Sequence, residues 1–112
     1  MRKTEPEEIL HFISRFTDRN RRPQVITTFT QGCCYWFAYI LCRRFESPFN
    51  NTDIAYDPIV NHFGCRINGR VYDITGDCTD QYSWKDWMDV YISDTLAGDR
   101  IIRDCIRMEE LQ

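Results

Sequence analysis

The dipeptide Asn68-Gly69 constrains the fold of this chain more than any other feature of its sequence. It separates two segments rich in β-forming residues, Val60 to Ile67 and Arg70 to Thr75. An Asn-Gly pair between two such segments is the strongest short-range signal for a β-hairpin with a two-residue turn. The sequence therefore predicts an antiparallel pair of strands in which Ile67 lies opposite Arg70.

This register sorts the side chains of the hairpin onto two faces, because successive side chains of a strand point to opposite sides. One face is apolar and is expected to join the core: Phe63, Cys65, Ile67, Tyr72 and Ile74. The other face is polar and carries His62 and Asp73, with Gly64 leaving space above the pair. Asp73 lies diagonal to His62, at a Cβ separation of roughly 7–8 Å or somewhat less, which a carboxylate and an imidazole can bridge. The alternative is that Asp73 is a charged residue on the outer surface of a half-buried sheet.

Helical periodicity predicts helices on both sides of the hairpin. From Glu5 to about Arg19, apolar residues recur at the i, i+3, i+4 and i+7 positions of an amphipathic helix. The segment from Gly32 to Phe45 is apolar on nearly every side, which predicts a helix buried all round at the centre of the fold. Ser83 is the expected N-cap of a third helix, with Asp86 completing a capping box. The tail from Asp99 fits a helix slightly better than a strand.

Shorter extended segments complete the prediction. Gln24 to Thr30 and Ile54 to Asp57 are expected to be extended. With 112 residues, the chain is expected to form one domain, residues 1–112, around one hydrophobic core. The predicted fold is α+β, in which a buried cysteine-bearing helix packs on a small antiparallel sheet and N- and C-terminal helices flank it.

Composition excludes several classes of partner. A hydrophobic content of 43% indicates a globular chain, and a net charge of −3 disfavours nucleic acid, which requires a basic face. The longest apolar run, Cys33 to Cys42, is too short to cross a bilayer, so no membrane partner is expected. The N-terminus has no apolar signal region, which predicts a cytoplasmic protein with six reduced cysteines. Because no Cys-x-x-Cys pair occurs, we expect no zinc ribbon and no redox dithiol. No cofactor is expected either.

Cys34 is the candidate nucleophile. It falls in the first turn of the helix predicted from Gly32, where the helix dipole and a nearby imidazolium would stabilise a thiolate against its ordinary pKa of about 8.5. A thiol, a base and a residue that orients the base form the arrangement of an activated nucleophile. The alternative is that Cys33 and Cys34 are small core residues, as reduced cysteines often are.

Two stretches carry a resemblance to known families. The segment Gly32 to Ala38 (GCCYWFA) resembles the start of the cysteine-bearing helix of papain-like peptidases. His62 and the segment Ile67 to Thr75 (INGRVYDIT) resemble the histidine and aspartate strands of transglutaminase-like proteins. This resemblance implies a minimal member of the papain-like superfamily, of phage or mobile-element type, with its cysteine helix packed on an antiparallel sheet.

The same resemblance assigns roles to individual residues. Cys34 would be the nucleophile, His62 the general base and acid, and Asp73 the carboxylate that orients the imidazole. Cys33 is the competing nucleophile. The oxyanion would be held by the backbone N–H of Cys34, with Gln31 as a possible side-chain donor.

Three functions follow as hypotheses. The first is a small cytoplasmic cysteine hydrolase or acyl transferase that acts on an amide, peptide or isopeptide bond of a protein or peptide substrate. The second is a non-catalytic protein-binding module, such as a phage-encoded inhibitor or adaptor, with aromatic anchors on a helix from Trp84 to Tyr91. The third and weakest is a metal site formed by His62, Asp73 and a cysteine.

Overall fold

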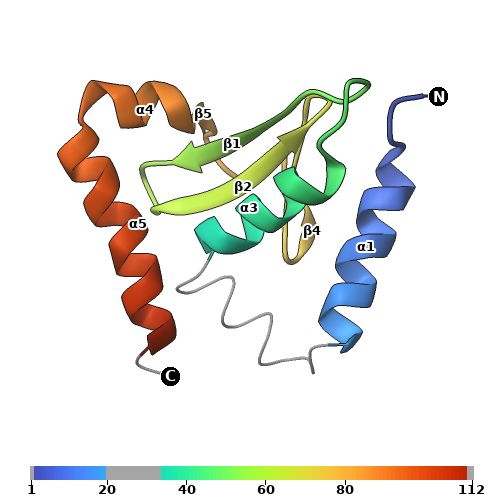
Figure 1. The fold of residues 1–112 in the computed structure, drawn as a ribbon, viewed down its shortest axis with the longest axis horizontal. Helices are drawn as coiled ribbons and strands as arrows, with labels where there is room; N and C mark the ends of the chain where they lie inside the picture. The colour runs from blue at the N-terminus through green and yellow to red at the C-terminus, as the bar shows by residue number, and fades with distance from the viewer. Residues whose placement is uncertain (1, 20–33, 111–112) are drawn as a thin grey trace.

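The computed structural model describes residues 2–19 and 34–110 and has the α+β fold expected from the sequence (Figure 1). The segment Gln24 to Thr30, expected to be extended, lies outside the described residues. Within the described ranges there are four helices and one five-stranded sheet. Their order is α1 (Pro6–Arg19), α3 (Cys34–Phe45), β1 (Thr52–Asp57), β2 (His62–Ile67), β3 (Arg70–Asp73), β4 (Gly76–Asp77), β5 (Lys85–Asp86), α4 (Trp87–Ser93) and α5 (Thr95–Glu110).

The sheet confirms the predicted hairpin. Its strand order is β4-β3-β2-β1-β5, and all neighbouring strands are antiparallel. Ile67 pairs with Arg70, as the Asn68-Gly69 turn predicts. Asn68 and Gly69 have φ angles of 52° and 90°, the positive values that a two-residue type I′ turn requires at both central positions.

Helix α3 packs across one face of this sheet and forms the main core with it. Phe37 and Leu41 of α3 belong to one buried cluster with Phe63 and Tyr72 of the sheet. However, α3 is not buried all round, because the sheet covers only one of its sides. Tyr39 is 42% exposed on the side that faces away from the sheet.

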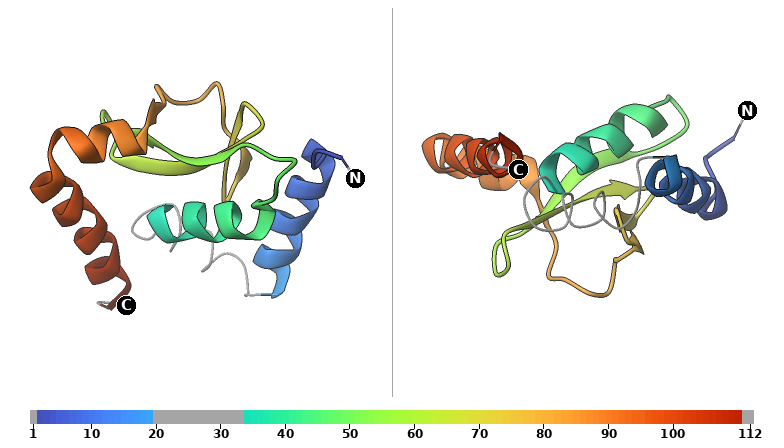
Figure 2. Two further views of the ribbon diagram at one scale, coloured as in Figure 1. Left: turned by 45° about the horizontal axis from the view of Figure 1, so that its top comes forward. Right: turned by 90° about the horizontal axis from the view of Figure 1, so that it is seen from below.

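The opposite face of the hairpin, predicted to be polar, is also covered. A second apolar cluster forms there around Val71 and Cys78, and Tyr82 and Trp84 pack against it. The segment between β4 and β5 carries these aromatic residues over the sheet (Figure 2). Gly64 does leave space on this face, but Trp84 fills it: a Cβ atom at position 64 would lie 3.1 Å from Cη2 of Trp84.

The predicted capping box at Ser83 is wrong. The backbone N–H of Ser83 instead donates a hydrogen bond to Asp57 Oδ2, at 3.0 Å, and Asp86 pairs with Arg66. Lys85 and Asp86 form the short edge strand β5 beside β1, so the helix begins only at Trp87. Partners elsewhere in the fold thus engage both residues of the predicted box.

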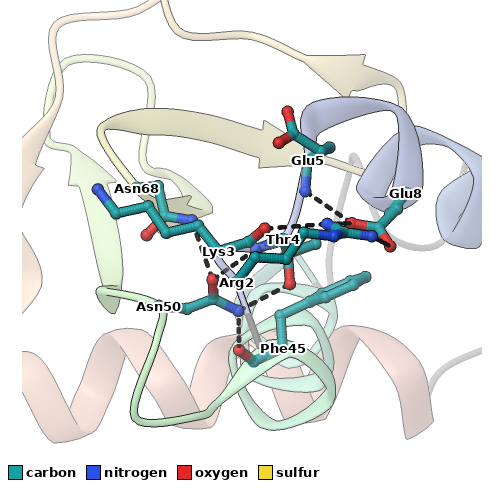
Figure 3. A network of polar contacts seen from close by, with 8 residues as sticks. All are labelled: Arg2, Lys3, Thr4, Glu5, Glu8, Phe45, Asn50 and Asn68. Atoms are coloured by element: carbon teal, nitrogen blue, oxygen red, sulfur yellow. Dashed lines mark hydrogen bonds and ion pairs between the residues drawn. The ribbon is translucent and has the colours of Figure 1, made fainter.

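Polar contacts attach the N-terminal segment to the end of α3 (Figure 3). Asn50 accepts a hydrogen bond from the backbone N–H of Thr4 at 2.9 Å. The Nδ2 atom of Asn50 donates to Thr4 Oγ1 and to the carbonyl oxygen of Phe45, both at 2.8 Å. Arg2, which precedes α1, pairs with Glu8 near the start of that helix. These contacts place α1 at the C-terminal end of α3.

The terminal helices lie at opposite ends of the molecule. Helix α1 is at one end, and α4 and α5 are at the other, as both figures show (Figures 1 and 2). The tail is helical as expected, although α5 begins at Thr95, earlier than Asp99. Among the described residues, the structure contains no helix that is both long and apolar enough to cross a membrane.

Candidate active site

Cys34 is the first residue of α3 and lies against the sheet. The helix begins Cys-Tyr-Trp-Phe, so its first turn carries no carboxylate that would oppose a negative charge on the thiol. The N-terminal end of a helix dipole favours such a charge. The position therefore has one of the features that a nucleophilic cysteine requires.

His62 and Asp73 meet where β2 begins and β3 ends. The His62 Nε2 atom lies 2.8 Å from Asp73 Oδ2. The other carboxylate oxygen, Oδ1, accepts hydrogen bonds from the backbone N–H of Thr75 at 2.8 Å and from its hydroxyl at 2.5 Å. Because both oxygens of Asp73 are engaged, the carboxylate is held in one orientation toward the imidazole.

The structure also brings Cys34 to His62. The Cys34 side chain lies close enough to the His62 ring to raise the pKa of that imidazole. Since Nε2 faces Asp73, Nδ1 is the ring nitrogen left for the thiol. The structure thus groups Cys34, His62 and Asp73, and all three residues are almost fully buried, at 6%, 6% and 4% exposed. Their catalytic role remains a prediction.

The electrostatics of this chain favour a charged imidazole. Burial lowers the pKa of His62, but the hydrogen bond with Asp73 and the influence of Cys34 outweigh burial and raise that pKa to about 9. Burial raises the pKa of Asp73, yet its hydrogen bonds with His62 and Thr75 prevail and hold it below its usual range. At neutral pH the pair is therefore an imidazolium beside a carboxylate.

Two aromatic rings form the wall of the site behind His62. The ring centroid of Tyr82 lies 4.8 Å from that of His62, and the centroid of Trp84 lies 5.9 Å away. Both residues come from the segment that crosses the second face of the sheet. Sequence reasoning missed them at the site because it placed Trp84 on a helix, and no motif spacing links these residues to His62.

The remaining predicted site residues have different outcomes. Gln31 and Cys33 lie outside the described residues, so the oxyanion donors and the choice between the two adjacent cysteines remain predictions. Among the described residues, no three His, Cys, Asp or Glu side chains are grouped so as to hold a metal ion.

A cleft of about 1020 Å³ lies between α1 and the end of α3 and is lined by Phe12, Arg44 and their neighbours. None of Cys34, His62 and Asp73 lines this cleft.

Comparison with known proteins gives one result. A family model described as "Phage YunG-like protein" matches residues 9–102, a range that includes Cys34, His62 and Asp73. No curated protein and no solved structure matches the chain. The phage-type expectation agrees with the description of this family. The match gives no support to a papain-like or transglutaminase-like relationship, which remains a prediction.

Proposed function

This chain belongs to the phage YunG-like protein family, and from its site we propose that it is a small cysteine hydrolase or acyl transferase. It would act on an amide, peptide or isopeptide bond of a protein or peptide substrate. The observation that carries the proposal is the hydrogen-bonded pair of His62 and Asp73, with Cys34 buried beside the His62 ring. A cytoplasmic location, expected from the sequence, is part of the same proposal.

The proposed reaction has two halves, formation of a thioester and its resolution, and the same three side chains act in both. The thiolate of Cys34 attacks the carbonyl carbon, and an S–C bond forms. The C–N bond then breaks as His62 transfers its proton to the departing amine, which leaves a thioester on Cys34. Water or a second amine attacks the thioester and returns a proton to His62, and the acyl group departs. Asp73 holds the imidazole in position throughout.

The electrostatics of the pair support this mechanism. An imidazolium next to a thiol stabilises the thiolate, and the pKa of His62 near 9 keeps the ring protonated at neutral pH. In the proposed mechanism the attacking species is the Cys34 thiolate paired with this imidazolium, so the first step uses no separate base. The proton that the amine requires is already on the His62 ring.

The direct test is the pH dependence of iodoacetamide labelling, measured for each cysteine by peptide mass spectrometry. We expect Cys34 to react rapidly well below pH 8 and to lose this reactivity in His62→Ala. Cys78 is an internal control, because it is buried in the second cluster and burial raises its pKa. A Cys34 that reacts no faster than an ordinary thiol, or that reacts equally fast in His62→Ala, would refute the proposed dyad.

A binding module is the second candidate, supported by exposed apolar residues on α4 and at the start of α5. Met88, Ile92 and Leu96 of α4 and α5 are 59%, 68% and 76% exposed, as is typical of an interaction surface when such residues gather. Of the aromatic residues on the predicted helix from Trp84 to Tyr91, Trp87 does not serve as an anchor, because its side chain is buried in the core.

The two candidates differ in their dependence on the thiol. If the protein acts as a binding module, Cys34→Ala leaves its effect on a host cell unchanged, whereas Ile92→Lys removes it. If the protein acts as an enzyme, the opposite pattern is expected. Circular dichroism of both variants controls for loss of the fold.

A further inference from the structure

Two cysteines outside the proposed triad contact each other. Cys42 of α3 and Cys65 of β2 face each other across the core, and their Sγ atoms are 2.6 Å apart. They lie 23 positions apart in the chain, so no short motif signals the pair. From this contact we infer that Cys42 and Cys65 are a redox-active dithiol that forms a disulfide by exchange with a low-molecular-weight disulfide such as oxidised glutathione.

The geometry of the pair suits such a bond. A disulfide has an S–S distance of about 2.05 Å, so closing the pair requires a movement of only about half an ångström. Each cysteine lies on a packed element: α3 covers the sheet, and β2 is the central strand, paired with β1 and β3. The bond would therefore connect two elements that already pack against each other.

The unequal exposure of the two thiols sets the order of the steps. Cys65 is 0% exposed, whereas Cys42 is half-buried, so a small disulfide can reach only Cys42. The hydrogen bond with Cys42 and the burial of the site also raise the pKa of Cys65. Cys42 is therefore the attacking thiol, and Cys65 acts second, as the resolving thiol.

The exchange balances in two steps. The thiolate of Cys42 attacks one sulfur of oxidised glutathione, forms a mixed disulfide and releases one glutathione thiolate. Cys65 then attacks the Cys42 sulfur and gives its proton to the second glutathione, which departs as a thiol. Together the cysteines lose two protons and two electrons, and one oxidised glutathione becomes two reduced molecules.

This inference departs from the expectation of a chain without a redox dithiol, which rested on the absence of a Cys-x-x-Cys pair. It also differs from the proposed enzymatic function, because it requires neither Cys34 nor a substrate. Cys34 and Cys42 lie on the same helix, so a bond at Cys42 would fix the helix that carries the proposed nucleophile.

The test uses the full chain with Cys34→Ala, so that exchange at Cys34 does not interfere. The folded protein is equilibrated with oxidised glutathione, remaining thiols are alkylated, and the peptides are mapped by mass spectrometry without reduction. We expect a peptide pair linking Cys42 to Cys65 with a loss of two hydrogens. We also expect a higher thermal unfolding midpoint, which dithiothreitol reverses.

Single variants in the same background separate the two roles. In Cys65→Ala, Cys42 should accumulate as a mixed disulfide with glutathione, because the resolving thiol is missing. In Cys42→Ala, Cys65 should remain a thiol. Cys78→Ala is the matched control: Cys78 is equally buried, its Sγ faces the carbonyl oxygen of Val71 at 3.6 Å, and its loss should leave the linkage unchanged.

Two outcomes would overturn the inference. The first is that Cys42 and Cys65 both remain alkylatable after equilibration with oxidised glutathione. The second is that they link only when denaturant is present. If the Cys65→Ala variant fails to fold, peptide mapping of the Cys34→Ala protein still tests whether Cys42 and Cys65 form a disulfide. Because none of these measurements uses a substrate, their failure is distinguishable from failure of the proposed enzymatic function.

Discussion

His62 Nε2 lies 2.8 Å from Asp73 Oδ2, although the two residues are 11 positions apart and belong to different strands. The hairpin turn at Asn68-Gly69 produces this proximity, because it brings the start of β2 beside the end of β3. Thr75 then holds the Asp73 carboxylate in place by donating two hydrogen bonds to its other oxygen, Oδ1. The pair therefore results from local strand pairing, and the packing of α3 adds the thiol.

Asp73→Asn should lower the pKa of His62 from its value of about 9, because the carboxylate supplies a hydrogen bond and a negative charge that raise it. NMR titration of the imidazole measures the shift. The variant should also lose roughly 1–3 kcal/mol of unfolding free energy, since it removes a hydrogen bond to a charged group. Asp77→Asn is the control, because Asp77 pairs with Arg70 away from His62. An unchanged His62 titration in Asp73→Asn would contradict the prediction.

The unfolding free energy should depend on pH through His62. Its pKa is raised in the folded protein to about 9, from about 6.5 in an unfolded chain. The stabilisation is therefore fully present below pH 6.5 and is lost as the pH rises through 9. Urea unfolding between pH 6 and pH 10 should show this loss in the wild type and not in His62→Gln. Parallel profiles for the two proteins would argue against it.

Gly64→Ala should destabilise the fold by about 1–3 kcal/mol, the usual cost of overpacking a filled core. The new Cβ atom would lie 2.6 Å from Val71 Cγ1 and 3.1 Å from Trp84 Cη2. Chemical denaturation gives the magnitude. If the clash with Val71 is the cause, Gly64→Ala should cost less in a Val71→Ala background than in the wild type. Equal costs in both backgrounds would exclude that contact as the source.

Asn50→Ala should loosen the attachment of α1 to the end of α3. It removes the hydrogen bonds to Thr4 and to the Phe45 carbonyl oxygen, with an expected loss of about 1–3 kcal/mol. Hydrogen exchange should become faster in α1 while β2 stays protected. Asn51→Ala is the matched control, because the hydrogen bonds of Asn51 with Asn68 use its backbone groups. Faster exchange in both variants would show that the effect is not specific to Asn50.

Local patterns predicted the elements well where neighbouring residues decide the structure. The helix from Glu5 to Arg19 and the strand pair around Asn68-Gly69 follow from periodicity and turn chemistry, and both are present. The capping box at Ser83 failed because its partners are distant in sequence: Asp57 binds the Ser83 backbone, and Arg66 binds Asp86. Hydrogen bonds from other elements thus outweighed a local helix signal.

By itself, the sequence determined the hairpin register, and with it the approach of Asp73 to His62, because a turn and an alternating strand constrain residues that are close along the chain. Only the tertiary structure decided which groups surround that pair. The packing of separate elements places Trp84 over Gly64 and brings Cys42 into contact with Cys65. Such packing reflects the shape and burial of side chains across the whole core, which no local spacing encodes.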